Sequence, residues 1–299
     1  MKPELEFIFD LVKQLRVDPG SRVQLQRDYD PRYTGGMVAE DGASRMGEGL
    51  ALLVDYQDRL AAQDVFGVLL VLQGLDAAGK DSTIKHVMSG VNPQGVEVRG
   101  FKEPSAEELN RDFLWRYQAK LPERGRIGIF NRSHYEEVLV VRVHPELLKS
   151  ERLPDSGIDE TIWKRRFRQI NDWERHLVDN GIRVIKVFLN LSKEEQAERF
   201  LRRIDDPSKN WKFSPSDVRE RHFWDDYQRA FGEMLNHTST EWAPWYVVPA
   251  DHKWFTRLAT AAVLISTLAD IDPRYPEVAD EVRQDMASVR DALAKDMNG

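Results

Sequence analysis

Five short apolar runs recur along the chain and predict a parallel β-sheet. The first, Val65–Gln73, is continuously apolar rather than alternating, which is typical of a parallel strand covered on both faces. Stretches with helical character separate it from four further runs, at residues 96–101, 126–130, 183–191 and 245–249. Strands that alternate with helices in this way indicate an α/β fold with a central parallel sheet of about five strands.

Helical segments flank this core at both ends. We expect an N-terminal appendage (residues 1–63) whose helix packs on the sheet, a core (64–272), and an acidic helical tail (273–299) suited to packing, including packing between subunits. The apolar positions with helical spacing are Leu50, Leu53, Val54 and Leu60 in the appendage and Val278, Val282, Met286, Val289 and Leu293 in the tail.

Two helix starts carry the pattern of a capping box, in which a Ser and a Glu three residues later satisfy each other's backbone N–H groups. These pairs are Ser105 with Glu108, and Ser192 with Glu195. They predict where the chain changes from strand to helix.

Composition narrows the class of protein. With 41% hydrophobic and 31% charged residues over 299 positions, the chain has ordinary globular composition and enough length for one large α/β domain. Cysteine is absent, which excludes disulfides, thiolate metal sites and cysteine nucleophiles. We find no apolar run of the length needed to span a bilayer, and the acidic N-terminal stretch is unlike a signal peptide, so we expect a cytoplasmic protein.

The net charge of −7 opposes non-specific binding to nucleic acid or to an anionic membrane, and we expect neither as a partner. A polyanionic substrate would have to meet a local cluster of Lys and Arg.

A phosphate-binding loop follows the first strand directly. Residues 74–80 read G-x-x-x-x-G-K, and the residues after them look helical. Glycines let backbone N–H groups turn toward phosphate oxygens, the helix N-terminus adds positive dipole, and Lys80 supplies a mobile cation. The predicted phosphate-binding residues are Gly74, Ala77, Ala78, Gly79, Lys80, Asp81 and Ser82.

One loop position departs from the usual pattern. Asp81 stands where a Ser or Thr hydroxyl normally holds Mg²⁺, so other groups must hold the metal in part. Asp76 is our candidate ligand for Mg²⁺, with Mn²⁺ as a substitute; its alternative role is that of a turn-forming carboxylate.

The third strand ends in Asn131, Arg132 and Ser133, at the edge of the sheet where open α/β folds bind ligands. We predict that Arg132 is catalytic together with Asp76 and Lys80; a surface or salt-bridged arginine is the alternative.

Segment 199–221 is rich in basic residues and contains a break at Pro207, which indicates a lid. Its candidate cations are Arg199, Arg203, Lys209 and Lys212, with a solvated charged face as the alternative. A second basic run, at residues 164–168, reads as an exposed helix surface, with one cation lining a channel for a polyanionic substrate as the alternative, and it is left outside the site.

Several long motifs together resemble the family-2 polyphosphate kinases, especially the class III members that phosphorylate both AMP and ADP. The similarity runs from DYDPRYTGG at Asp28 through the phosphate loop, DFLWR, IFNRSHYEEVLVVRVH and DDPSKNWKFSPSD to APWYVVPADHKWF at Phe255. It implies a P-loop kinase-like three-layer sandwich, a basic polyphosphate channel, Mg²⁺ beside the loop and a mobile lid.

The resemblance also bears on the nucleotide. Asn131 replaces an Asp carried by another class, which leaves a second metal contact open, and Glu136 stands at a class III position that faces the nucleotide. A helix-start carboxylate is the alternative for Glu136. Arg116, in the DFLWR motif, lies where P-loop kinases grip the acceptor phosphate, so Arg116, Asn131 and Glu136 are the predicted nucleotide-binding residues.

These observations predict an enzyme that transfers phosphoryl groups from inorganic polyphosphate to AMP, ADP or both, giving ADP and ATP, and that assembles as a homo-oligomer. An ATP-dependent nucleotide or small-molecule kinase is the nearest alternative. A P-loop regulatory ATPase is the second.

Overall fold

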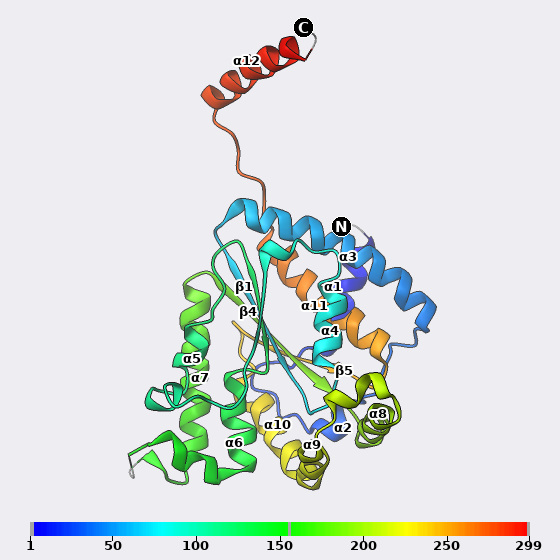
Figure 1. Ribbon diagram of the computed structural model, residues 1–299, viewed down its shortest axis with the longest axis vertical. Helices are drawn as coiled ribbons and strands as arrows, with labels where there is room; N and C mark the ends of the chain where they lie inside the picture. The colour runs from blue at the N-terminus through cyan, green and yellow to red at the C-terminus, as the bar shows by residue number, and fades with distance from the viewer. Residues whose placement is uncertain (1–2, 155–156, 298–299) are drawn as a thin grey trace.

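A computed structural model describes residues 3–154 and 157–297, with the side chain of Lys212 left out (Figure 1). Five parallel strands form one sheet in the order β2-β3-β1-β4-β5. The strands are β1 Gly67–Gln73, β2 Val96–Gly100, β3 Ile127–Asn131, β4 Ile182–Asn190 and β5 Trp245–Pro249. The α/β class and the five strands predicted from the apolar runs are confirmed.

Helices cover both faces of the sheet, because side chains along each strand alternate between two hydrophobic cores. Leu70 of β1 joins one core and Leu69 joins the other. The first core is covered by α1 (Pro3–Leu15), α3 (Ala39–Gln63), α4 (Lys80–Val87) and α11 (Lys253–Ile271). The second is covered by α2 (Leu25–Asp28), α5 (Trp115–Gln118), α7 (Ile162–Asp179) and α10 (Trp224–Thr238), and α6 (Val140–Val143) lies beside it. Short 3-10 helices are η1 (Pro93–Gly95), η2 (Glu108–Asn110), η3 (His134–Val138) and η4 (Pro145–Glu151).

The N-terminal segment is attached to the core in two ways. Helix α3 has Leu53 and Leu60 fully buried in the first core, together with Leu70 of β1, and it also lies along α11. The strand β5 holds the other end, because the backbone N–H of Val17 donates to the carbonyl of Trp245 at 2.8 Å. The structure thus contains the helix that the spacing predicts, and its buried face joins the core on this side of the sheet.

Helix α11 is the one helix among the described residues that is long and apolar enough to cross a membrane. This differs from the expectation that no apolar run in the sequence is long enough to span a bilayer. Two thirds of its most apolar stretch (67%) is buried inside the molecule, against α3 and strands β4 and β5. This burial is that of a core helix in a globular domain.

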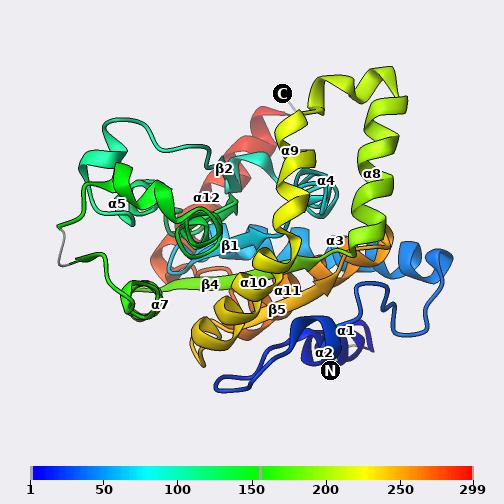
Figure 2. The same cartoon turned by 90° about the horizontal axis from the view of Figure 1, so that it is seen from below.

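The segment predicted as a lid forms two helices that project from the body side by side (Figure 2). The chain rises through α8 (Lys193–Asp205), turns in η6 (Pro207–Lys212) and returns through α9 (Pro215–Glu220) and η7 (Arg221–Phe223). The break at Pro207 is thus the start of the turn at the tip.

Only one of the two capping boxes forms completely. Ser105 and Glu108 exchange both bonds, at 2.7 and 3.3 Å, although the element they start is only a 3-10 turn. At α8, Ser192 caps the N–H of Glu195 at 3.1 Å, but the N–H of Ser192 donates to Asp251 instead. The Glu195 carboxylate is diverted because Arg199 and Arg202 bind it.

Helix α12 (Asp280–Asp296) stands apart from the body at the end of an extended segment, at the top of Figure 1. All of its residues are exposed. The predicted helix of the tail is present, and within the described chain it packs on nothing.

Candidate functional site

The loop between β1 and α4 has the backbone conformation of a phosphate cradle. Gly74 adopts φ +154°, and a Cβ there would meet the Leu189 carbonyl oxygen at 3.0 Å. Ala77 and Gly79 also have positive φ, at +66° and +105°. These turns bring the loop to the first residue of α4, where unpaired N–H groups can bind phosphate.

Lys80 lies inside this loop. Its ammonium donates to the carbonyls of Gly74 at 2.6 Å and Leu75 at 3.3 Å. Burial lowers the pKa of Lys80, and the nearby carboxylate of Asp76 works in the opposite direction. The Lys80 ammonium is thus held against the backbone of the loop, next to where a phosphate would bind.

Arg199 holds the loop from behind. Its Nη1 donates to the carbonyls of Ala77 and Ala78, each at 2.9 Å, and its Nη2 donates to the carbonyls of Ala250 and Asp251 beyond β5. The side chain is only 5% exposed. Arg199 was predicted as a cation of the lid; it is instead a buried brace between α8 and the loop.

Arg132 and Asp76 form an ion pair across the site, with Nη2 and Oδ1 2.7 Å apart. Arg132 follows β3 with φ +64°, a left-handed conformation that is costly for a residue with a Cβ. Burial disfavours its charge, but Glu136 and Asp76 raise the pKa of Arg132 overall. The guanidinium therefore stays charged and faces the loop.

Asn131 and Asp81 also meet, because the Asn131 amide donates to Asp81 at 2.6 Å. These are the two positions that depart from the usual P-loop pattern. Asn131 supplies no carboxylate at the end of β3, but the carboxylate of Asp81, at the start of α4, lies against it. The site therefore still has a carboxylate at this position.

A narrow cleft of about 50 Å³, open to solvent, lies between the loop, the segment after β3, and the lid. Its charged lining residues are Asp76, Arg132, Glu136, Asp217, Glu220 and Arg221, and its apolar wall is formed by Leu75, Leu139, Val140, Trp224, Tyr227 and Phe231. A larger hollow between α2 and α10 contains no residue of the phosphate loop. We take the smaller cleft as the site because the loop opens into it.

Glu136 belongs to this cleft. Burial raises its pKa, while Arg132 and Lys80 oppose that rise, and Gln73 donates a hydrogen bond to the carboxylate. Glu136 lies in the first turn of η3, as the alternative requires, but its side chain is only partly exposed and it lines the cleft.

Three further predicted site residues, Arg116, Arg203 and Lys209, do not line the cleft. Arg116 is 9% exposed, pairs with Glu108 at 3.1 Å and donates to the Lys102 carbonyl at 2.8 Å, and it does not line the cleft. Arg203 reaches Asp217 at 3.8 Å across the two lid helices. Lys209 pairs with Asp206 on the exposed tip, and the side chain of Lys212 lies outside the described residues.

Two cations near the loop were not among the predicted residues. Arg257 of α11 donates to the Ser82 hydroxyl at 3.1 Å, and Lys253 lies at the start of the same helix. Burial lowers the pKa of Lys253, and Arg199 and Arg202 lower it further, so these groups form one positive cluster. In the sequence, both cations lie in the HKWFTR segment that follows the fifth strand, and this segment was the signal that could have identified them.

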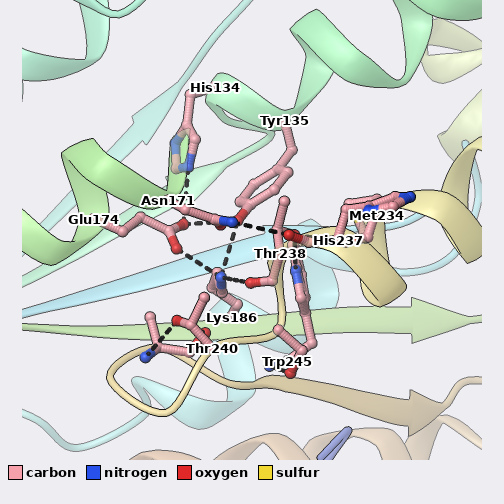
Figure 3. A network of polar contacts seen from close by, with 12 residues as sticks. His134, Tyr135, Asn171, Glu174, Lys186, Met234, His237, Thr238, Thr240 and Trp245 are labelled. Atoms are coloured by element: carbon pink, nitrogen blue, oxygen red, sulfur yellow. Dashed lines mark hydrogen bonds and ion pairs between the residues drawn. The ribbon is translucent and has the colours of Figure 1, made fainter. Parts of the chain in front are cut away.

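A buried polar network supports the segment that carries Arg132 and Glu136 (Figure 3). The Lys186 ammonium of β4 contacts Glu174 of α7 at 2.6 Å and the Tyr135 hydroxyl at 2.9 Å. Tyr135 donates to Glu174 at 2.8 Å, and His134 contacts the same carboxylate at 3.2 Å. Burial alone would raise the pKa of Glu174, but the Lys186 cation lowers it below its usual value, so this carboxylate is ionised.

A second support lies beside it. Arg166 of α7 is 2% exposed, donates to the Glu137 carbonyl at 2.7 Å and binds the Glu151 carboxylate. The basic run at residues 164–168 had been read as an exposed surface. For Arg166 this reading is wrong, because the helix turns that side chain inward.

Three features together define a P-loop phosphotransferase. They are the parallel sheet, the phosphate loop with its lysine, and the arginine at the end of the neighbouring strand. Comparison with known proteins narrows this class. The sequence profile of the polyphosphate kinase 2 (PPK2) family matches residues 39–276. The chain therefore belongs to the polyphosphate kinase 2 family.

Individual relatives agree with this assignment. An ADP-polyphosphate phosphotransferase of Rhodopseudomonas palustris is 47% identical over 95% of this chain and 98% of its own. An AMP/ADP-polyphosphate phosphotransferase of Meiothermus ruber is 42% identical over 89% and 96%. The crystal structure of polyphosphate kinase 2 from Arthrobacter aurescens superposes with a TM-score of 0.86 at 39% identity, covering 94% of this chain and 96% of the other.

Proposed function

We propose that this protein transfers phosphoryl groups from inorganic polyphosphate to AMP and ADP, forming ADP and ATP, in a Mg²⁺-dependent and reversible reaction. The observation that carries the proposal is that Arg132 and Glu136 line one cleft beside the phosphate loop, where Glu136 also feels the charge of Lys80. The names of the two relatives above, which specify polyphosphate with ADP or with both nucleotides, support the same substrates.

The chemistry follows from the charges that face each other. Phosphoryl transfer requires mainly alignment of donor and acceptor and neutralisation of developing charge. Lys80 and Arg132 approach the transferred group from the loop and from the end of β3. Both are held by backbone or ion-pair contacts, so little reorganisation is needed when charge develops.

The donor set fits Mg²⁺. Among the described residues no group of three or more His, Asp or Glu side chains could enclose a metal, but Mg²⁺ bound with phosphates needs only one or two carboxylates. Asp76 would hold the ion, with Asp81 as the second carboxylate, and Mn²⁺ could replace it. When bound, the ion would neutralise phosphate charge.

The positive cluster gives polyphosphate a path to the loop. Arg257 contacts the loop through Ser82, Lys253 lies near enough to Arg202 and Arg257 for both to lower its pKa, and none of the three lines the cleft. A chain of phosphates along these cations would present its terminal group to Lys80. Acceptor and donor would then approach the loop from different sides.

The test is a product analysis with purified protein, Mg²⁺, long-chain polyphosphate and either AMP or ADP. We expect ADP and ATP from AMP, and ATP from ADP. Activity only with ATP as donor would favour a nucleotide or small-molecule kinase, and slow ATP hydrolysis without transfer would favour a regulatory ATPase. Either result would overturn the proposal.

A further inference from the structure

Helix α12 has an apolar face that no described part of the chain covers. Its residues Val282, Met286, Val289 and Leu293 are between 50% and 59% exposed, and Figure 1 shows the helix away from the body. The match to the family ends at residue 276, so this helix lies beyond the shared core. An exposed apolar face of this kind marks an interaction site.

The spacing of these residues fits a helical partner. They follow one another at intervals of four, three and four, the spacing of two repeats of a heptad seam, and such a seam can pack against another helix with the same seam. We propose that α12 is a self-association element that pairs, in parallel, with α12 of a second copy of this chain.

The charges beside the seam favour the parallel arrangement. With Met286 at position a and Val289 at position d, Asp285 occupies position g and Arg290 occupies position e. In a parallel pair, position g faces position e of the following heptad on the other helix. Asp285 then meets Arg290 of the partner subunit, and symmetry repeats the attraction.

The antiparallel arrangement is disfavoured by the same residues. When Met286 packs on Val289 of the partner subunit in that direction, Arg283 lies near Arg290 of the partner subunit, again twice. Like charges at these positions destabilise the pair. Within the described chain Arg283 has an ion pair with Asp280 at 3.8 Å, whereas the ion pairs found on α12 leave Asp285 and Arg290 available.

The connecting segment allows this geometry. Residues 273–279 contain no helix and include two prolines, and seven extended residues span at most about 23 to 25 Å. Two bodies could therefore lie side by side at the same end of the paired helices. A free helix of 17 residues is only marginally stable in water, so pairing would also stabilise α12 itself.

Sedimentation equilibrium of the full chain tests the proposal. Asp285→Arg and Arg290→Asp each place like charges across the parallel pair, and each should weaken self-association about tenfold. The double variant Asp285→Arg/Arg290→Asp restores opposite charges and should return the dissociation constant to within a few-fold of wild type. Asp291→Arg, which makes the same charge change on the outer face, is the matched control and should behave as wild type.

All three positions are exposed and outside the site, so these variants should fold and remain active. A wild-type protein that is monomeric at high concentration would overturn the proposal. So would an oligomer whose dissociation constant is the same in all four variants, since another surface would then hold it. Stronger association of Arg290→Asp alone would indicate the antiparallel pair and would refute the parallel one.

Discussion

Glu136→Gln is the change that best tests how the acceptor is chosen. The substitution removes one negative charge and keeps the shape of the side chain and one accepting oxygen. In the cleft this carboxylate faces Arg132 and Lys80, and burial already raises its pKa. The substitution therefore removes a contact to the nucleotide and leaves Arg132 and Lys80 with less negative charge beside them.

These two effects act differently on the two acceptors. One polar contact to a substrate is worth about 1 to 3 kcal/mol, or roughly 5- to 150-fold in kcat/KM. AMP should lose most of that amount. ADP should lose less, because its second phosphate can bind the cations that Glu136 no longer neutralises. We therefore expect the ratio of kcat/KM for AMP to that for ADP to fall about tenfold.

The assay is initial rates with each acceptor at saturating polyphosphate and fixed Mg²⁺. Glu233→Gln is the control, because Glu233 is a carboxylate of α10 that pairs with Arg142 and does not line the cleft. An AMP-to-ADP ratio unchanged by Glu136→Gln, or changed equally by Glu233→Gln, would refute the role of Glu136.

The remaining predictions concern charge at the loop and in the interior. Lys80→Ala should lower kcat at least about a hundredfold with the fold intact by circular dichroism, and activity within a few-fold of wild type would exclude the loop as the active centre. Raising salt should weaken binding of polyphosphate more steeply than binding of AMP, and equal slopes in KM against salt would contradict a cationic path for the polymer. Lys186→Met should cost about 3 to 5 kcal/mol in urea unfolding because Glu174 is left buried without its cation, and adding Glu174→Gln should recover most of this loss. Burial, with Glu151, raises the pKa of Glu137 from 4.5 to about 7, so the stability it contributes is complete below pH 4.5 and is lost as pH rises through 7. Compared with a Glu137→Gln variant, the wild type should lose about 2 to 3 kcal/mol over that range, and parallel stability curves would refute the shift.

The fold could be predicted because each strand and the phosphate loop depend on local patterns. A continuous apolar run such as Val65–Gln73 is needed wherever both faces of a strand are covered, and G-x-x-x-x-G-K requires particular backbone turns. Both signals lie within ten residues of chain. The sheet and the loop were therefore predicted from the sequence, and the structure confirms them.

Residues whose role depends on distant partners were harder to assign. Arg199 has the helix spacing of a lid residue, but two of the carbonyls that it binds belong to the loop some 120 residues earlier and two lie about 50 residues later. Arg166 lies in a dense basic run, and only the direction of α7 shows that it faces the interior. The cleft residue Glu220 lies in no local motif. Asp217 and Arg257 lie in the DDPSKNWKFSPSD and HKWFTR segments, but nothing in these segments shows which of their charges faces the loop.

The conformation of Arg132 depends both on local sequence and on contacts with distant residues. A left-handed backbone at a residue with a Cβ costs about 1 to 2 kcal/mol, so neighbouring contacts must hold it. Its own N–H donates to the Leu72 carbonyl at 3.2 Å, and Ser133 beside it accepts from Gln73 at 3.0 Å. Tyr135, two residues further on, is fixed by the buried charges of β4 and α7. Local sequence identifies the arginine at the end of β3, but the strand and helix that keep it directed at the loop lie about 40 to 55 residues away, and only the folded chain brings them together.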